Sequence, residues 1–147
     1  MAASVYNEAI VVQSGIRHFR SNVKPGVMPT LQARLASLHA NYGARVNLVC
    51  DSTDFTPVQF RDLMKEPMFE SIEGLNEPDV VGPHAYQGFR DNWASQTYPA
   101  TLAFQQDLAA AMLADPITNP KAIFSPAMAN PANSRYLRSV AADFISM

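Results

Sequence analysis

The chain has 147 residues, of which 48% are hydrophobic and 16% are charged, and its net charge is −2 at pH 7. These values suit one packed domain and argue against an intrinsically disordered chain. Since the 11 Lys and Arg residues are spread singly, we expect no nucleic-acid partner and no membrane-surface partner.

Cys50 is the single cysteine, so the chain has neither an internal disulfide nor a cysteine-based metal cluster. Its apolar neighbours indicate a small buried side chain. No apolar run approaches the roughly 18 residues of a membrane span. The N-terminal residues lack a signal-peptide pattern, so the localisation stays open, with secretion expected if a signal peptide lies upstream.

Short apolar runs alternate with amphipathic segments, which is the pattern of βα units around a parallel sheet. In chain order, the expected strands are residues 15–20, 45–50, 71–75 and 122–125, with a last strand that begins near Phe144. The expected helices are residues 8–13 and four more that begin at Pro29, at Pro57 after a Thr56 cap, at Pro99 and at Ser134. The sequence therefore predicts a β-α-β-α-β-α-β-α-β order with right-handed crossovers.

The third expected strand ends in an amide and a carboxylate, Asn76 and Glu77. Pro78 cannot continue a strand ladder, so both side chains are expected at the carboxyl end of the strand. Parallel α/β sheets bind their ligands at that end. The segment is therefore a candidate active site.

Alternation along the strands gives a second argument, because every other residue shares one face of a sheet. By this counting, polar residues share a face on three neighbouring strands: Arg20 on the first, Asn47 and Asp51 on the second, and Glu73 and Glu77 on the third. Such groups either form a connected hydrogen-bond network or, if a bulge shifts the register, lie at a wet rim. The sequence leaves both arrangements open.

Three segments together resemble one family: GIRHFR at residues 15–20, IEGLNEPD at residues 72–79 and FSP at residues 124–126. They are similar to the (β/α)8 barrels of the large clan of retaining glycoside hydrolases, and the Asn-Glu-Pro tripeptide is the most specific part. The resemblance runs from about residue 8 to residue 147. It implies an α/β fold, a partial TIM barrel that holds about strands two to six with their helices.

The resemblance also implies roles for single residues. Glu77 becomes the general acid/base, Asn76 hydrogen-bonds the sugar hydroxyl beside the anomeric carbon, and Arg20 supports the site by pairing with the second carboxylate. The acid must be protonated when it donates to the leaving oxygen and ionised when it activates water. The implied reaction is hydrolysis of an O-glycosidic bond in a carbohydrate substrate.

Residues 79–98 form a long connection rich in Gly, Pro, His, Tyr and Trp, and connections of this length usually carry function. Within it His84, Tyr86 and Trp93 are candidates for sugar contact, because aromatic faces stack on the apolar face of a pyranose. Trp93 has a second interpretation as an anchor that holds the loop in place.

One requirement of the family lies beyond these residues. A retaining mechanism needs a second carboxylate roughly 5 to 5.5 Å from the first, and the clan carries this nucleophile on its seventh strand. A barrel needs roughly 250 residues. We therefore expect residues 1–147 to be one partial barrel domain, truncated at the C-terminus and at the N-terminus. The missing half of the barrel or another copy of the chain is the expected partner, and the isolated chain is expected to be inactive.

Two other classes of function stay open. The first is a non-catalytic carbohydrate-binding or structural barrel domain in which the acid is vestigial. The second is another parallel α/β protein in which Asn-Glu-Pro is accidental, although the six glycines form no Gly-x-Gly or Walker-type motif. Because His18, His39 and His84 are scattered, we expect no metal site, and no cofactor is expected.

Overall fold

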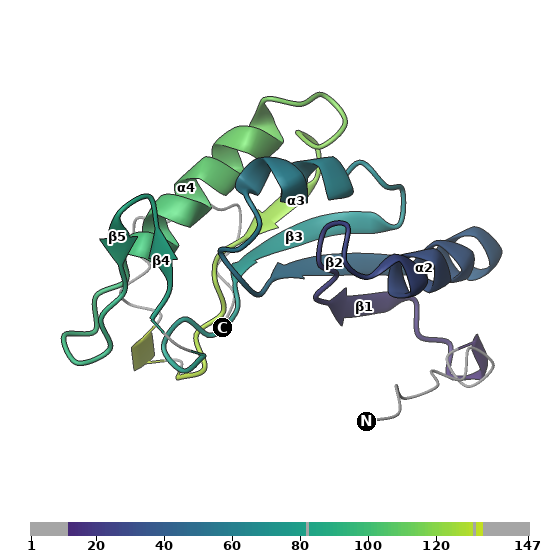
Figure 1. The fold of residues 1–147 in the computed structure, drawn as a ribbon. Coiled ribbons are helices and arrows are strands. Elements are labelled where there is room, and N and C mark those ends of the chain that lie inside the picture. The colour runs from purple at the N-terminus through teal and green to yellow at the C-terminus, as the bar shows by residue number, and fades with distance from the viewer. Residues whose placement is uncertain (1–11, 82, 131, 134–147) are drawn as a thin grey trace.

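The computed structural model describes residues 12–81, 83–130 and 132–133. The elements in chain order are β1 (His18–Ser21), α2 (Pro29–Tyr42), β2 (Arg45–Cys50), α3 (Pro57–Leu63), β3 (Phe69–Leu75), β4 (Ala85–Tyr86), β5 (Phe89–Arg90), α4 (Pro99–Leu113) and β6 (Ala122–Phe124) (Figure 1).

Four of the strands form one sheet in the order β1-β2-β3-β6, and every neighbouring pair is parallel. Helices α2 and α3 lie in the connections between β1, β2 and β3, and α4 lies in the connection from β3 to β6. The order of the strands in space is thus their order in the chain. This confirms the expected α/β fold with a parallel sheet.

The hydrophobic core lies between the sheet and its helices. One cluster of buried side chains joins residues of α2, α3 and α4 to the strands, and its members include Leu35, Val46, Leu48, Phe60, Ile72, Phe104, Leu108 and Ile123. The strand members are cross-strand partners, because Leu48 pairs with Ile72 and Ile72 pairs with Ile123, and two register shifts between β2 and β3 keep such partners on one face. All three helices therefore pack against the same face of the sheet. Cys50 belongs to the cluster with no exposed surface, as its apolar neighbours predict.

The helix boundaries follow from local chemistry. Pro29 begins α2, and Gly43 ends it in the left-handed region with φ of 69°. Thr56 begins α3 through a capping box, in which its hydroxyl accepts a hydrogen bond from the Gln59 backbone and the Gln59 side chain accepts one from the Thr56 backbone. Both helices begin where the sequence predicts, and α2 also ends at the glycine that the sequence predicts as its C-cap.

The cap of α4 comes from a distant residue. Asp91, which is 2% exposed, accepts hydrogen bonds from the backbone N–H groups of Ala100 and Thr101 at 2.9 and 3.1 Å and from the Thr101 hydroxyl. A carboxylate stabilises a helix N-terminus because the first N–H groups have no partner within the helix. Asp91 therefore ties the connection after β3 to the start of α4.

Several strand boundaries differ from the prediction. Strand β1 begins at His18 rather than at Gly15, because Gly15 has φ of 72° and donates to the Val12 carbonyl in a turn. Strand β3 begins two residues early, at Phe69. The predicted loop 79–98 contains the antiparallel pair β4 and β5, which sequence alternation over two residues cannot reveal. The helix expected from Ser134, the strand expected near Phe144 and most of the helix expected at 8–13 lie outside the described residues.

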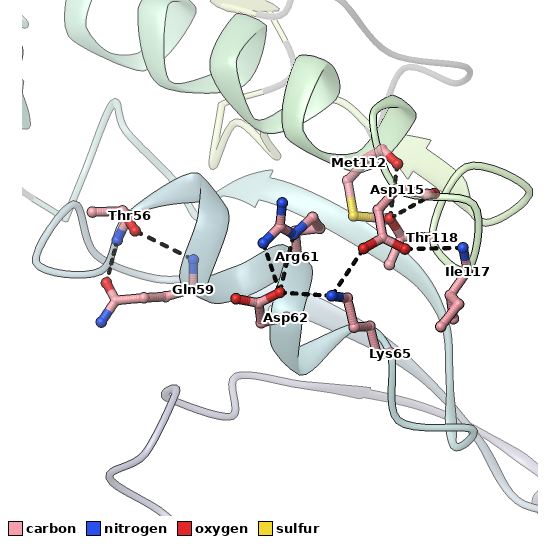
Figure 2. A network of polar contacts seen from close by, with 9 residues as sticks. All are labelled: Thr56, Gln59, Arg61, Asp62, Lys65, Met112, Asp115, Ile117 and Thr118. Atoms are coloured by element: carbon pink, nitrogen blue, oxygen red, sulfur yellow. Dashed lines mark hydrogen bonds and ion pairs between the residues drawn. The ribbon is translucent and has the colours of Figure 1, made fainter.

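A group of charged side chains joins α3 to the segment after α4, and Figure 2 shows it from close by. Lys65 contacts Asp62 at 3.0 Å and Asp115 at 2.8 Å, and Arg61 contacts Asp62 at 2.7 Å. Hydrogen bonds from Lys65 and Arg61 lower the pKa of Asp62, and a hydrogen bond from Lys65 lowers that of Asp115. We call Arg61, Asp62, Lys65 and Asp115 the corner network.

Candidate functional site

The sheet face opposite the helix-covered core carries polar side chains at its centre. Glu73 is buried, with a side chain that is 3% exposed, and its carboxylate accepts hydrogen bonds from Arg20 Nε at 2.9 Å, Arg20 Nη2 at 2.7 Å and Asn47 Nδ2 at 3.1 Å. Ser71 donates from its hydroxyl to Asn47 Oδ1 at 2.9 Å. We call Arg20, Asn47, Ser71, Glu73 and Asn76 the Glu73 network.

This arrangement answers the question that the alternating pattern leaves open. Of the predicted polar residues, Arg20, Asn47 and Glu73 belong to a connected network, whereas Asp51 lines an open hollow and Glu77 follows the end of β3. The register explains the network, because Arg20 pairs with Asn47 and Asn47 pairs with Ser71 across the parallel strands. The bidentate contact with Arg20 compensates for burial of the Glu73 carboxylate, since fork-shaped guanidinium pairs are among the stronger hydrogen-bonded contacts.

The Glu73 hydrogen bond raises the pKa of Arg20, and the negative charges of Glu73 and Glu77 add to this effect while burial opposes it. Arg20 is therefore the cation of the Glu73 carboxylate, and the charge of Glu77 adds the smallest of these effects on its pKa.

Asn76 is fixed at both its backbone and its side chain. Its N–H donates to the Cys50 carbonyl at 2.8 Å, and its Oδ1 accepts a hydrogen bond from Arg20 Nη2 at 2.8 Å. Because a guanidinium has only donors, the oxygen of the amide must face Arg20, and the Asn76 Nδ2 donors face away from it. The sequence did not predict this contact between Arg20 and Asn76, since it assigned Arg20 to a second carboxylate and Asn76 to a sugar hydroxyl.

Glu77 adopts an uncommon backbone conformation, with φ of 45°. A residue with a side chain pays a steric penalty in this left-handed region, and such residues gather at functional sites. Its N–H donates to the Ala127 carbonyl at 2.8 Å, and its own carbonyl accepts from Val80 and Val81. Strand β3 ends at Leu75, so the face of Glu77 is set by this turn and not by strand alternation.

Two anchors hold the segment that follows Glu77. The Trp93 indole donates to the Pro78 carbonyl at 2.8 Å while the residue stays 42% exposed. Asp79 accepts hydrogen bonds from the backbone N–H groups of Ala129 and Asn130 and from the Asn133 side chain, at 2.8, 3.1 and 2.8 Å. Burial raises the pKa of Asp79, but these three hydrogen bonds outweigh burial and leave it below its usual value.

The other two aromatic candidates have partners of their own. The Tyr86 hydroxyl donates to Asp107 of α4 at 2.9 Å, and its ring packs edge-on against Phe104 with 5.2 Å between centroids. Burial lowers the pKa of His84, and its Nε2 has no hydrogen-bond partner among the described residues. Neither side chain has a hydrogen bond to Asn76 or Glu77 in the part of the chain that the structure describes. Trp93 is the one of the three that reaches the Asn-Glu-Pro segment.

A hollow of about 220 Å³ lies beside the Glu73 network, at the carboxyl ends of β1, β2 and β3. Its lining residues are Arg20, Ser21, Asn22, Val49, Asp51 and Asn76. Most of this wall is polar. The hollow therefore suits a small hydrophilic ligand rather than an apolar one.

The sequence did not reveal every residue of this site. Asn22 was missed because the expected first strand ended at Arg20, although a polar residue just past a strand end is a usable signal. The clamp by Asp79 was missed because its partners lie about 50 positions along the chain. Gly74 was missed too: a side chain there would clash with Gln105 Oε1, so glycine allows β3 to approach α4.

Among the described residues, no group of three or more His, Cys, Asp or Glu side chains could hold a metal ion. No helix among them has the length and apolar character needed to cross a membrane. Comparisons with family models, with curated proteins and with solved structures gave no match. The function must therefore be inferred from the site itself.

Proposed function

We propose that the chain forms the acid/base half of a glycoside hydrolase active site, in which Glu77 is the proton donor for cleavage of an O-glycosidic bond. The observation that carries this proposal is the contact chain from Glu73 through Arg20 to Asn76, next to a Glu77 with a strained backbone. The resemblance of the Asn-Glu-Pro segment to the clan supplies the chemistry.

The fold supports the barrel part of this proposal. In a doubly wound sheet, the strand order reverses and helices cover both faces. Here the order β1-β2-β3-β6 does not reverse, and α2, α3 and α4 pack on one face. A barrel has the same arrangement, with helices outside and the opposite face turned toward the interior. The Glu73 network would then belong to that interior.

Each side chain has a role that follows from its contacts. Glu77 has no side-chain hydrogen bond within the described residues, so its carboxyl group is available to a leaving oxygen. Asn76 presents its Nδ2 donors because Arg20 occupies its oxygen. Arg20 is a positioning residue, and its paired Glu73 lies too deep in the sheet to act as the second carboxylate. That nucleophile is expected on a strand beyond the four of this sheet.

Release of reducing sugar from a panel of oligosaccharides tests the proposal, using the product of the complete reading frame that contains residues 1–147. We expect Glu77→Gln to lower the rate about 10²- to 10⁴-fold, the usual range for loss of general acid/base catalysis. Glu70→Gln is the matched control, because Glu70 lies on the same strand and bonds the exposed His18. An equal rate in wild type and Glu77→Gln would refute the proposed role.

A second candidate function is carbohydrate binding without turnover. The Trp93 ring favours it, because the indole is anchored to Pro78 yet 42% exposed and can stack on a sugar. Saturable sugar binding with no hydrolysis by the complete reading-frame product would support this candidate over the enzyme. Trp93→Ala would then weaken the binding.

A further inference from the structure

One wall of the hollow at the strand ends offers a hydrogen-bond donor, and another offers an acceptor. Asn76 and Asp51 both line it. Asn76 is a donor toward the hollow, because its Oδ1 accepts from Arg20 and its Nδ2 has no hydrogen bond within the described residues. Asp51 follows β2 directly, and an ionised carboxylate is an acceptor only.

The contacts of Asp51 leave one of its oxygens available. Asn22 Nδ2 donates to Asp51 Oδ2 at 3.1 Å, and Lys24 Nζ lies 3.5 Å from the same oxygen. Asp51 Oδ1 has no contact with the residues that the structure describes, and the side chain is 20% exposed. The carboxylate is thus oriented through Oδ2 while Oδ1 can accept from a ligand.

We propose that Asp51 and Asn76 bind hydroxyl groups of one neutral sugar ring, with Asp51 as the acceptor and Asn76 as the donor. A hydroxyl both donates and accepts, so a polyol can satisfy the two walls together. The volume of about 220 Å³ is smaller than that of pockets for drug-sized ligands, roughly 300 to 1,000 Å³, and suits a single ring. This inference rests on the proposed function, since it assigns the sugar specificity of the same site.

Asp51 also determines which sugars are rejected. A uronic acid would bring a second carboxylate near that of Asp51, and like charges at close range repel. Two cations reduce this repulsion only in part. The Lys24 ammonium is 35% exposed and 3.5 Å from Asp51, and the Arg20 guanidinium in the wall of the hollow is already bonded to Glu73 and Asn76. Neutral sugars therefore bind more tightly than their uronic acids.

The test is a titration of the full chain, labelled with ¹⁵N, with glucose, galactose, mannose and xylose and with glucuronic acid as the charged counterpart. The reporter is the side-chain amide of Asn76. We expect at least one neutral sugar to shift this signal, and glucuronic acid to bind more weakly than glucose. Asp51→Asn should weaken binding about tenfold or more, the effect of losing a hydrogen bond to a charged group.

Two further variants make the result specific. Asp54→Asn is the matched control, because Asp54 is an exposed acid three residues along the chain, and it should leave the binding unchanged. Asp51→Ser removes the carboxylate in a different way and should reproduce the loss. Unchanged binding in both Asp51 variants, or no shift of the Asn76 signal with any neutral sugar, would overturn the inference. Either result concerns only the binding of the sugar and does not affect the turnover test of Glu77. Conversely, normal turnover in Glu77→Gln together with weak binding in Asp51→Asn would refute only the catalytic proposal.

Discussion

The Glu73 network and the corner network use the same kinds of side chain, but their carboxylates are buried to different extents. In the Glu73 network, a carboxylate that is 3% exposed binds Arg20, which is 52% exposed, through two hydrogen bonds. In the corner network of Figure 2, Lys65 and Asp62 are 37% and 51% exposed. Exposed ion pairs contribute little because water and salt screen them, whereas a buried carboxylate is costly unless it keeps its partner.

Their positions in the chain differ as well. Lys65 and Asp115 precede β3 and β6, so the corner network lies at the amino ends of these strands. The Glu73 network extends to Asn76, which follows β3. Residues at the carboxyl ends of parallel strands usually serve the ligand, and those at the other end serve stability. Buried charge at the ligand end is therefore the feature that marks the candidate site.

The largest expected effect follows from removing the cation that binds the buried Glu73 carboxylate. Arg20 is itself 52% exposed, so for Arg20→Leu we expect a loss of about 2 kcal/mol in the free energy of unfolding, the range for hydrogen bonds to a charged group, measured with urea. The double variant Arg20→Leu with Glu73→Leu should recover much of this loss, because no unpaired charge remains. If Arg20→Leu lowered the free energy of unfolding as little as a surface substitution does, the two networks would not differ in their contribution to stability.

A smaller effect is expected at the helix cap drawn in Figure 2. Thr56→Ala removes the hydroxyl that accepts from the Gln59 backbone at 3.2 Å, and should lower the free energy of unfolding by about 1 kcal/mol. Thr53→Ala is the control, because Thr53 lies outside α3 and its cap. Equal losses in the two variants would show that the capping box does not stabilise α3.

Protonation of His84 is expected to change the stability of the fold near neutral pH. Burial lowers its pKa below the ordinary value, about 6.5, while the charge of Asp91 opposes this shift. The unfolded chain therefore binds a proton at His84 more readily than the folded chain. The folded state keeps its full stability above about pH 6.5, where His84 is neutral in both states, and it loses stability as the pH falls below that value. His84→Gln should flatten that part of the stability curve from urea unfolding. An unchanged slope would contradict the assignment to His84.

The smallest effect is expected in the corner network. Lys65→Met removes both ion pairs of Lys65. Lys65 and Asp62 are exposed while Asp115 is 15% exposed, so we expect a loss of less than about 1 kcal/mol in the free energy of unfolding. The measurement should be made at low and at high salt, since only a screened contribution would vary between them. A clear loss of stability at both salt concentrations would show that the corner network contributes to the free energy of unfolding as the Glu73 network does.

Local sequence signals predicted the elements that local chemistry sets. Pro29 and Gly43 define α2, the apolar run defines β2, and alternation predicted that Arg20 and Glu73 share a face. Contacts between distant segments were not predictable in this way. The cap that Asp91 provides for α4 and the clamp that Asp79 places on the loop after β6 depend on the tertiary fold, which no local pattern encodes.

The central claim is that Glu77 donates the proton, and the dependence of turnover on the leaving group tests it most directly. An aryl glycoside with an acidic leaving group needs little protonation, whereas an alkyl glycoside of the same sugar needs a general acid. In the complete reading-frame product, we predict that Glu77→Gln slows cleavage of the alkyl glycoside far more than formation of the first product from the aryl glycoside. Glu70→Gln should slow neither reaction. Equal slowing of both substrates by Glu77→Gln, or none at all, would contradict the account.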